Sequence, residues 1–313
     1  MRCPAGTQLL KGVSRSFYLT LRLLPAPMRG AASLAYLLAR TSDTLADTSA
    51  APPALAAKWL DCFGQAVAGA ALLPRWPGAL LNAIQDPRER GLLDEADALF
   101  RWLDRLPAGE VALVREVLAI IIAGQQLDLQ RFADATRARP VALADAEALE
   151  DYAWRVAGCV GAFWTKLGVL TLGERFSTAP APWLLERGIS FGKGLQLVNI
   201  LRDLPADLAT GRCYLPVADP LDTPTLLDAH QAWLERAQAW VGEGFAYAAT
   251  LPCRRLRAAT VLPALLARET LARLQGATWH DLQARVKVPR SRVYLALVRA
   301  LAGPGTGLIS VVL

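Results

Sequence analysis

The sequence predicts an all-α protein that folds as one helical bundle around a central cavity. Alternating Val, Ile and Thr runs of the kind that form strands are absent, whereas Leu, Ala, Arg and Gln, which favour helix, dominate the chain. Hydrophobic residues make up 53% of the 313 residues and charged residues only 20%, so the chain can bury a large core.

Prolines divide the chain into nine segments long enough to be helices. Several exceed the usual helix length of about 11–12 residues, and long apolar helices with short connections are typical of a bundle. In chain order, helix 28–48 follows Pro25 and Pro27, helix 54–72 follows Pro52 and Pro53, helices 88–104 and 110–137 lie between Pro77 and Pro140, helix 142–174 lies between Pro140 and Pro180, helix 182–209 lies between Pro180 and Pro216, helix 225–250 lies between Pro220 and Pro252, helix 253–276 follows Pro252, and helix 290–302 follows Pro289.

No solenoid repeat, low-complexity segment or flexible linker interrupts this pattern, so we expect a single domain over residues 1–313. The five cysteines are widely spaced and show no metal-binding spacing, which favours reduced thiols in the cytoplasm. No signal peptide follows Met1, and the longest apolar stretch, residues 118–123, is far short of the roughly 20 residues that a membrane span needs. We therefore expect a soluble or peripheral cytoplasmic protein, and a monomer.

The net charge of +6 comes from basic residues that are spread along the chain and are almost all arginine, so nucleic-acid binding is not expected. The basic excess gathers at the C-terminus, where no Asp or Glu follows Asp281. Two interpretations stay open for this region: a solvated tail, or a weak peripheral contact with anionic lipid. Its basic residues are Arg285, Lys287, Arg290, Arg292 and Arg299.

Four polar residues share one face of the predicted helix 28–48. Tyr36, Arg40, Asp43 and Asp47 follow one another at spacings of four, three and four, which places neighbours about 5–6 Å apart at Cβ on a helix. Carboxylates are rarely left buried without a partner, and few other charges occur nearby, so a solvated charged face is the weaker interpretation. This pair of aspartates is a candidate cation site.

The predicted helix 182–209 repeats the pattern. Gln196, Asn199, Asp203 and Asp207 step by three, four and four, with Arg202 and Arg212 close by. Carboxylate and amide oxygens are hard ligands suited to Mg²⁺. Pro205 lies between the two aspartates, so the helix is expected either to bend there or to end there.

Two such pairs facing each other across a bundle core could hold several Mg²⁺ ions around a diphosphate. Arginine suits this site because its planar guanidinium binds phosphate oxygens bidentately. The ions would neutralise the leaving diphosphate and assist its departure. The arginines next to the aspartates are Arg15, Arg40, Arg202 and Arg212.

A third segment, residues 152–164, begins with Tyr152 and contains Gly158 and Gly161. Small residues at this spacing would let a helix or a substrate approach the backbone closely, although they often serve helix packing alone. Tyr152 could carry a proton in a site that has no histidine to spare, but the residues by themselves favour a structural role for it.

Together, the motifs 14-SRSF-17, 43-DTLAD-47, 152-YAWRVAGCVG-161, 196-QLVNILRDLPAD-207 and 211-GRCYLP-216 resemble those of the squalene/phytoene synthase family. The resemblance covers most of the chain and implies the all-α isoprenoid synthase fold. It also implies a prenyltransferase in which Asp43, Asp47, Asp203 and Asp207, supported by Asn199 and Gln196, bind Mg²⁺ and diphosphate. Diphosphate-binding positions would be Ser14, Arg15, Arg40, Arg202 and Arg212. Tyr152 would transfer a proton, and Tyr36 would be an active-site aromatic residue.

The chain departs from the family pattern at Ala46 and Ala206, where an acidic residue often occurs, and at Pro205. The motif forms favour condensation of two farnesyl diphosphates through presqualene diphosphate, with subsequent reduction to squalene by NADPH. Alternatives within the family are release of presqualene diphosphate and formation of hydroxysqualene, dehydrosqualene or phytoene without NADPH. A non-catalytic lipid-binding or assembly role is the remote alternative, because all four aspartates are present.

Overall fold

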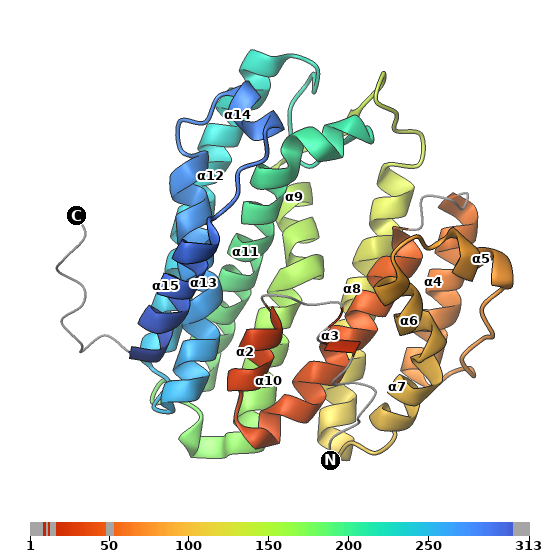
Figure 1. Ribbon diagram of the computed structural model, residues 1–313, viewed down its shortest axis with the longest axis vertical. Helices are drawn as coiled ribbons and strands as arrows, with labels where there is room; N and C mark the ends of the chain where they lie inside the picture. Colours follow the sequence, from red (N-terminus) through yellow and green to blue (C-terminus); the bar gives the residue numbers. More distant parts are fainter. Residues whose placement is uncertain (1–8, 11, 13–16, 48–52, 303–313) are drawn as a thin grey trace.

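The computed structural model describes residues 9–10, 12, 17–47 and 53–302. Long helices stand roughly parallel in it and form a bundle (Figure 1). This confirms the all-α fold predicted from the sequence. In chain order the helices are α2 (Phe17–Leu23), α3 (Ala26–Ala46), α4 (Pro53–Ala68), α5 (Gly78–Ala83), α6 (Pro87–Asp94), α7 (Ala96–Leu103), α8 (Ala108–Arg131), α9 (Ala146–Ala153), the π-helical segment η1 (Trp154–Gly158), α10 (Cys159–Leu172), the short 3₁₀ turn η2 (Gly173–Arg175), α11 (Ala181–Ala209), α12 (Thr223–Ala249), α13 (Arg254–Leu274), α14 (Trp279–Gln283) and α15 (Arg290–Ala302).

Two short strands interrupt the helical pattern. β1 (Val141–Ala142) pairs in parallel with β2 (Arg212–Cys213), so the predicted helix 142–174 begins later, at Ala146. The Asp145 side chain accepts a hydrogen bond from the backbone N–H of Ala148 at 2.8 Å and so caps α9. The strands were not predicted because two-residue segments carry no alternating pattern.

Two other predicted helices also differ from the structure. The helix predicted over 88–104 is broken at Glu95 into α6 and α7, and the helix predicted over 110–137 ends at Arg131. The residues after α8 form a turn closed by mutual backbone hydrogen bonds between Thr136 and Arg139. Helices α2, α5 and α14 were not predicted, because each has seven residues or fewer.

The core is built mainly from leucine. One large cluster joins α2, α3, α4, α7, α8 and α10, and a second joins α11, α12 and α13. Segment Ala146–Arg175 is long and apolar enough, by length and composition, to cross a membrane. It packs against α8 and α11, so we interpret it as a core helix of the bundle.

The approach of α10 to α11 is unusually close because glycines face each other. A Cβ atom on Gly161 would lie 1.8 Å from the carbonyl oxygen of Gly188, and one on Gly192 would lie 2.3 Å from that of Ala157. These positions therefore require glycine. The predicted close approach at Gly161 is confirmed, and its partner is another helix.

Candidate functional site

Both predicted aspartate pairs line one cavity of about 250 Å³. Its lining residues come from the C-terminal parts of α3 and α8 and from α9, η1, α11 and the turn that follows α11. Two helices that are far apart in the sequence thus bring their carboxylates together. The lining residues are Asp43, Ala46, Asp47, Gln125, Asp128, Leu129, Tyr152, Val156, Gln196, Asn199, Ile200, Asp203, Asp207, Arg212 and Tyr214.

The first pair lies at the C-terminal end of α3, with Asp43 in the last turn and Asp47 as the C-cap residue. Arg40 contacts Asp43 at 3.5 Å and Glu89 of α6 at 2.5 Å, so its guanidinium bridges two carboxylates. The Gln125 amide donates a hydrogen bond to Asp43 Oδ1 at 2.6 Å. Burial raises the pKa of Asp43 to about 6, against the opposing effect of Arg40 and with a further contribution from Asp47. Burial also raises the pKa of Asp47.

The second pair lies near the end of α11, which continues through Pro205 to Ala209. The alternative that the helix ends at the proline is therefore wrong. Arg202 holds Asp203 bidentately, with Nε 3.0 Å from Oδ1 and Nη2 2.5 Å from Oδ2. Burial, then the charge of Asp203, raises the pKa of Asp207 to about 7.

Carboxylates from different helices affect one another here. The charge of Asp47 on α3 contributes to the raised pKa of Asp207 on α11, and so does that of Asp128 on α8. Four acidic groups in one cavity have raised pKa values, chiefly because of burial, and such clusters indicate a functional site.

Asp128 was missed in the sequence, and its side chain, 12% exposed, is more enclosed than those of Asp43 and Asp203. The Tyr214 hydroxyl donates a hydrogen bond to Asp128 Oδ2 at 2.8 Å, and Arg212 Nη1 lies 3.7 Å from the same oxygen. Burial raises the pKa of Asp128 to about 6. The signal that could have found it is the run of polar residues Gln125, Gln126 and Asp128 in an otherwise apolar helix.

Arg212 and Tyr214 are placed by the turn after α11 and by the β1–β2 pairing. Gly211 has a φ of +88°, a conformation that favours glycine, and its carbonyl accepts a hydrogen bond from the N–H of Val141 at 2.9 Å. Leu143 N–H bonds the Cys213 carbonyl at 3.0 Å on the other side of Arg212. The two-residue strand therefore fixes the direction of both functional side chains.

Tyr152 lies at the floor of the cavity and is 8% exposed. Its ring stacks on that of Tyr214 with centroids 4.5 Å apart, and the Tyr214 hydroxyl lowers the pKa of Tyr152 against the effect of burial. Burial, then the charge of Asp128, raises the pKa of Tyr152 far above its ordinary range, so the hydroxyl stays protonated. The π-helical segment directly after it widens the helix, as often happens at functional sites.

The oxygen atoms of the cavity fit a hard cation. Gln125 Oε1 and Asp128 Oδ1 are buried acceptors that have no hydrogen-bond partner within the part of the chain that the structure describes. Among the described residues, however, no three His, Cys, Asp or Glu side chains converge closely enough to hold one metal ion by themselves. Each ion would therefore take some of its ligands from water or from a substrate, as Mg²⁺ commonly does.

Most of the predicted site residues meet in this cavity, with some exceptions. Arg40 and Arg202 reach it through their paired aspartates, whereas Tyr36 is half-buried against the core and does not line it. Ser14 and Arg15 lie outside the described residues. Asn199 Nδ2 lies 3.5 Å from Gln196 Oε1, so these two amides form one polar strip along α11.

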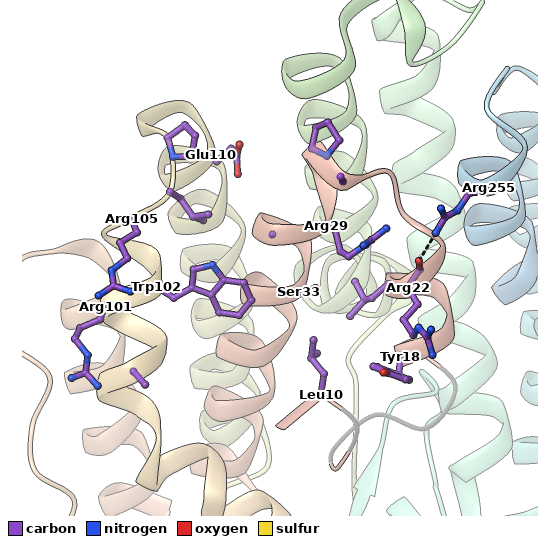
Figure 2. A pocket seen from close by; sticks show the side chains of 17 residues that line it. Leu10, Tyr18, Arg22, Arg29, Ser33, Arg101, Trp102, Arg105, Glu110 and Arg255 are labelled. Carbon is purple, nitrogen blue, oxygen red and sulfur yellow. Dashed lines mark hydrogen bonds between the residues drawn. The ribbon is translucent and has the colours of Figure 1, made fainter. Parts of the chain in front are cut away.

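A larger hollow of about 1090 Å³ lies at the other end of α3, between α2, α7 and the start of α8 (Figure 2). Arginines surround it, but two of them serve the end of α2. Arg29 donates to the Leu24 carbonyl from Nε and Nη2, and Arg255 donates to the Arg22 carbonyl at 3.0 Å (Figure 2). Because cations at this position stabilise a helix C-terminus, we assign these two arginines a structural role.

Comparison with solved structures gives the class of the protein. The squalene synthase TcSQS in complex with the ligand E5700 superposes with a TM-score of 0.78 at 21% identity, covering 95% of this chain and 85% of that one. A dehydrosqualene synthase superposes with a TM-score of 0.61 at 22% identity, covering 95% and 94%. The fold is therefore that of the all-α isoprenoid synthases.

The family model for squalene/phytoene synthase matches residues 10–292. The chain belongs to this family, whose members are prenyltransferases. It is 26% identical to the presqualene diphosphate synthase of Zymomonas mobilis over 91% of this chain and 89% of the relative.

Two other relatives are phytoene synthases. Identity is 30% to the 15-cis-phytoene synthase of Synechocystis over 68% of this chain, and 32% to the bifunctional lycopene cyclase/phytoene synthase of Colletotrichum graminicola over 65%. The chain spans 55% and 32% of the lengths of these two relatives.

Proposed function

We propose that this prenyltransferase joins two molecules of farnesyl diphosphate head to head, through presqualene diphosphate, with Mg²⁺ as the cofactor. The observation that carries the proposal is the meeting of Asp43/Asp47 and Asp203/Asp207 in one cavity, with arginines at its edge. Carboxylates of two helices facing each other suit a polyanionic substrate only if cations lie between them. The cavity volume of about 250 Å³ suits polar head groups.

The two aspartate pairs, together with Asn199, would hold the ions. When bound, Mg²⁺ would neutralise the diphosphate and assist its departure from the prenyl chain. Asp128 Oδ1, which has no hydrogen-bond partner among the described residues, gives the same cavity a further acceptor for a cation.

The arginines would bind the diphosphate after exchanging partners. Arg202 is bound to Asp203 and Arg40 to Asp43 in the structure. A cation at those aspartates would compete for the same oxygens, which would leave each guanidinium able to bind a phosphate bidentately. Arg212, at the opposite edge near Asp128, would bind from the other side, with Gln196 as a further polar contact.

Tyr152 would move the proton that is lost when the cyclopropane closes. Because its hydroxyl stays protonated, it can accept a proton only by passing its own proton on. Tyr214 and then Asp128, linked by the 2.8 Å hydrogen bond, form a path for that transfer. Asp128, with a pKa of about 6, is a suitable acceptor at the end of this path.

The product depends on the fate of presqualene diphosphate. The motif forms predict reduction by NADPH to squalene. The presqualene diphosphate synthase that aligns over 89% of its length favours release of the intermediate instead. Phytoene synthases among the relatives make a longer substrate a further candidate.

Incubation with [1-¹⁴C]farnesyl diphosphate and Mg²⁺, with and without NADPH, tests the proposal. We expect presqualene diphosphate without NADPH and squalene with it. Presqualene diphosphate as the product under both conditions would indicate that the enzyme releases this intermediate without reduction. A C30 hydrocarbon whose formation does not depend on NADPH would indicate that the carbocation loses a proton instead of accepting a hydride. Absence of any condensation product from farnesyl or geranylgeranyl diphosphate would refute the proposed function.

Helix α15 supports the proposed peripheral contact with the inner face of the cytoplasmic membrane. Tyr294, Val298 and Leu301 are exposed at spacings of four and three, so they form one apolar stripe along the helix. Arg290 lies exposed at the N-terminal end of the helix, and an apolar stripe with adjacent basic residues is typical of helices at anionic bilayers. Deleting residues after Val288 should abolish sedimentation with phosphatidylglycerol vesicles; undiminished binding would refute this contact.

A further inference from the structure

Pro205 stands in α11 midway between Asp203 and Asp207. A proline has no N–H, so the carbonyl four residues earlier loses its helical hydrogen bond, and the proline ring also crowds that carbonyl. Here the carbonyl belongs to Leu201, whose side chain is completely buried. A buried carbonyl needs a partner, because water cannot supply one.

His230 of α12 supplies that partner. Its Nε2 lies 3.2 Å from the Leu201 carbonyl oxygen, and the residue is 2% exposed. Helices α11 and α12 pack side by side along most of their length (Figure 1). Burial lowers the pKa of His230, so the ring is neutral, and the contact requires the tautomer that carries its proton on Nε2.

The hydrogen bond from His230 to the Leu201 carbonyl lies next to the second aspartate pair. Only four residues of α11 follow Pro205, and Asp207 is one of them. This last turn is joined to the rest of the helix with one backbone bond fewer than usual. The bond from His230 therefore acts at the joint that sets the direction of Asp207 relative to Asp203.

We propose that His230 is a positioning residue for the second aspartate pair: it donates, from a neighbouring helix, the hydrogen bond that Pro205 cannot, and so holds Asp203 and Asp207 at the spacing that binds the metal–diphosphate group. The role rests on the proposed function of this pair. It depends on a residue of α12 that lies outside the cavity and that the aspartate motif does not include.

The test uses His230→Phe, which keeps a ring but removes the donor, and His230→Gln, which keeps an N–H donor. Calorimetric titration with Mg²⁺ and inorganic diphosphate measures binding, and urea unfolding measures stability. We expect His230→Phe to weaken diphosphate binding by about tenfold or more, as is usual for residues that orient metal ligands. His230→Gln should restore most of the affinity.

Pro205→Ala supplies the missing backbone N–H. It therefore tests whether the effect of His230→Phe depends on the hydrogen bond that the proline removes. In this background His230→Phe should no longer lower stability or affinity, because the backbone itself now bonds the Leu201 carbonyl. Thr260→Val is the control: it removes a buried hydrogen bond to the Leu256 carbonyl in α13, and it should lower stability without changing diphosphate affinity.

If His230→Phe loses stability but binds Mg²⁺ and diphosphate within twofold of wild type, His230 is structural only and the proposal is wrong. The proposal is equally refuted if His230→Phe weakens binding as much in the Pro205→Ala background as in the natural one. If His230→Phe does not fold, the comparison of His230→Gln and the double variant with wild type decides in the same way. Failure of wild type to bind Mg²⁺ and diphosphate would refute the proposed function instead.

Discussion

Tyr214→Phe is the most informative single substitution in the cavity. It removes one hydroxyl and keeps the ring that stacks on Tyr152 with centroids 4.5 Å apart. The lost hydrogen bond to Asp128 is 2.8 Å long, and its acceptor is an enclosed carboxylate. Bonds of this kind to charged groups contribute about 1.5–3 kcal/mol. Since Tyr214 lowers the pKa of Asp128, its removal raises that pKa further, and protonation of Asp128 will keep the loss near the lower end of this range.

The same substitution interrupts the proposed proton path, so turnover should fall by about 10²-fold, the lower end of the effect of general acid–base groups. Formation of C30 product from farnesyl diphosphate measures turnover, and urea unfolding measures stability. Tyr247→Phe is a matched control, because it removes a buried hydroxyl 2.8 Å from Thr165 Oγ1, outside the cavity. That neutral bond should cost about 0.5–1.5 kcal/mol and leave turnover unchanged.

Turnover of Tyr214→Phe within twofold of wild type would refute the proton path. Equal losses of turnover in Tyr214→Phe and Tyr247→Phe would show that stability alone is measured.

Three further predictions concern the cavity and its walls. Asp203→Asn should abolish turnover while the circular dichroism spectrum and Tm stay near those of wild type; unchanged turnover would contradict a ligand role. Because burial raises the pKa of Asp207 to about 7, the folded metal-free protein binds this proton more tightly than the unfolded chain does. Its free energy of unfolding should therefore fall as pH rises from about 4 to 7, and a flat or rising profile would contradict the assignment. Gly161→Ala places a Cβ atom 1.8 Å from the Gly188 carbonyl oxygen and should lower Tm by about 5 °C, the shift that about 3 kcal/mol produces in a chain of this length; an unchanged Tm would contradict the close contact.

The helical fold and the central cavity follow from patterns that repeat along the chain. The spacing of Asp43 from Asp47 fixes one face of a regular helix, so its prediction needed no tertiary information. Proline at helix starts gave most boundaries within a few residues, as at α3 and α11. The break at Glu95 has no proline or glycine beside it and left no such signal.

The rest of the site depends on which helices meet. Asp128 carries no motif of its own, and its importance comes from Tyr214 and Arg212, residues more than eighty positions later in the chain. The interpretation of Pro205 as a bend or an end considered α11 alone. His230, which donates to the carbonyl that Pro205 leaves without a helical hydrogen bond, lies on α12, and no motif in the sequence links it to the proline.

The two walls of the cavity differ in how far they can move. On one wall, Gly161 and Gly192 bring the backbones of α10, η1 and α11 into direct contact, with no side chains between them that could repack. The opposite wall, α3 with α8, packs through leucine and isoleucine side chains of the core, which have alternative rotamers. Under the proposed function, adjustment of α3 and α8 would accommodate the prenyl chains, while Tyr152 and the second aspartate pair keep their relative positions. We therefore predict that side chains on α3 and α8 decide which prenyl chain length is accepted.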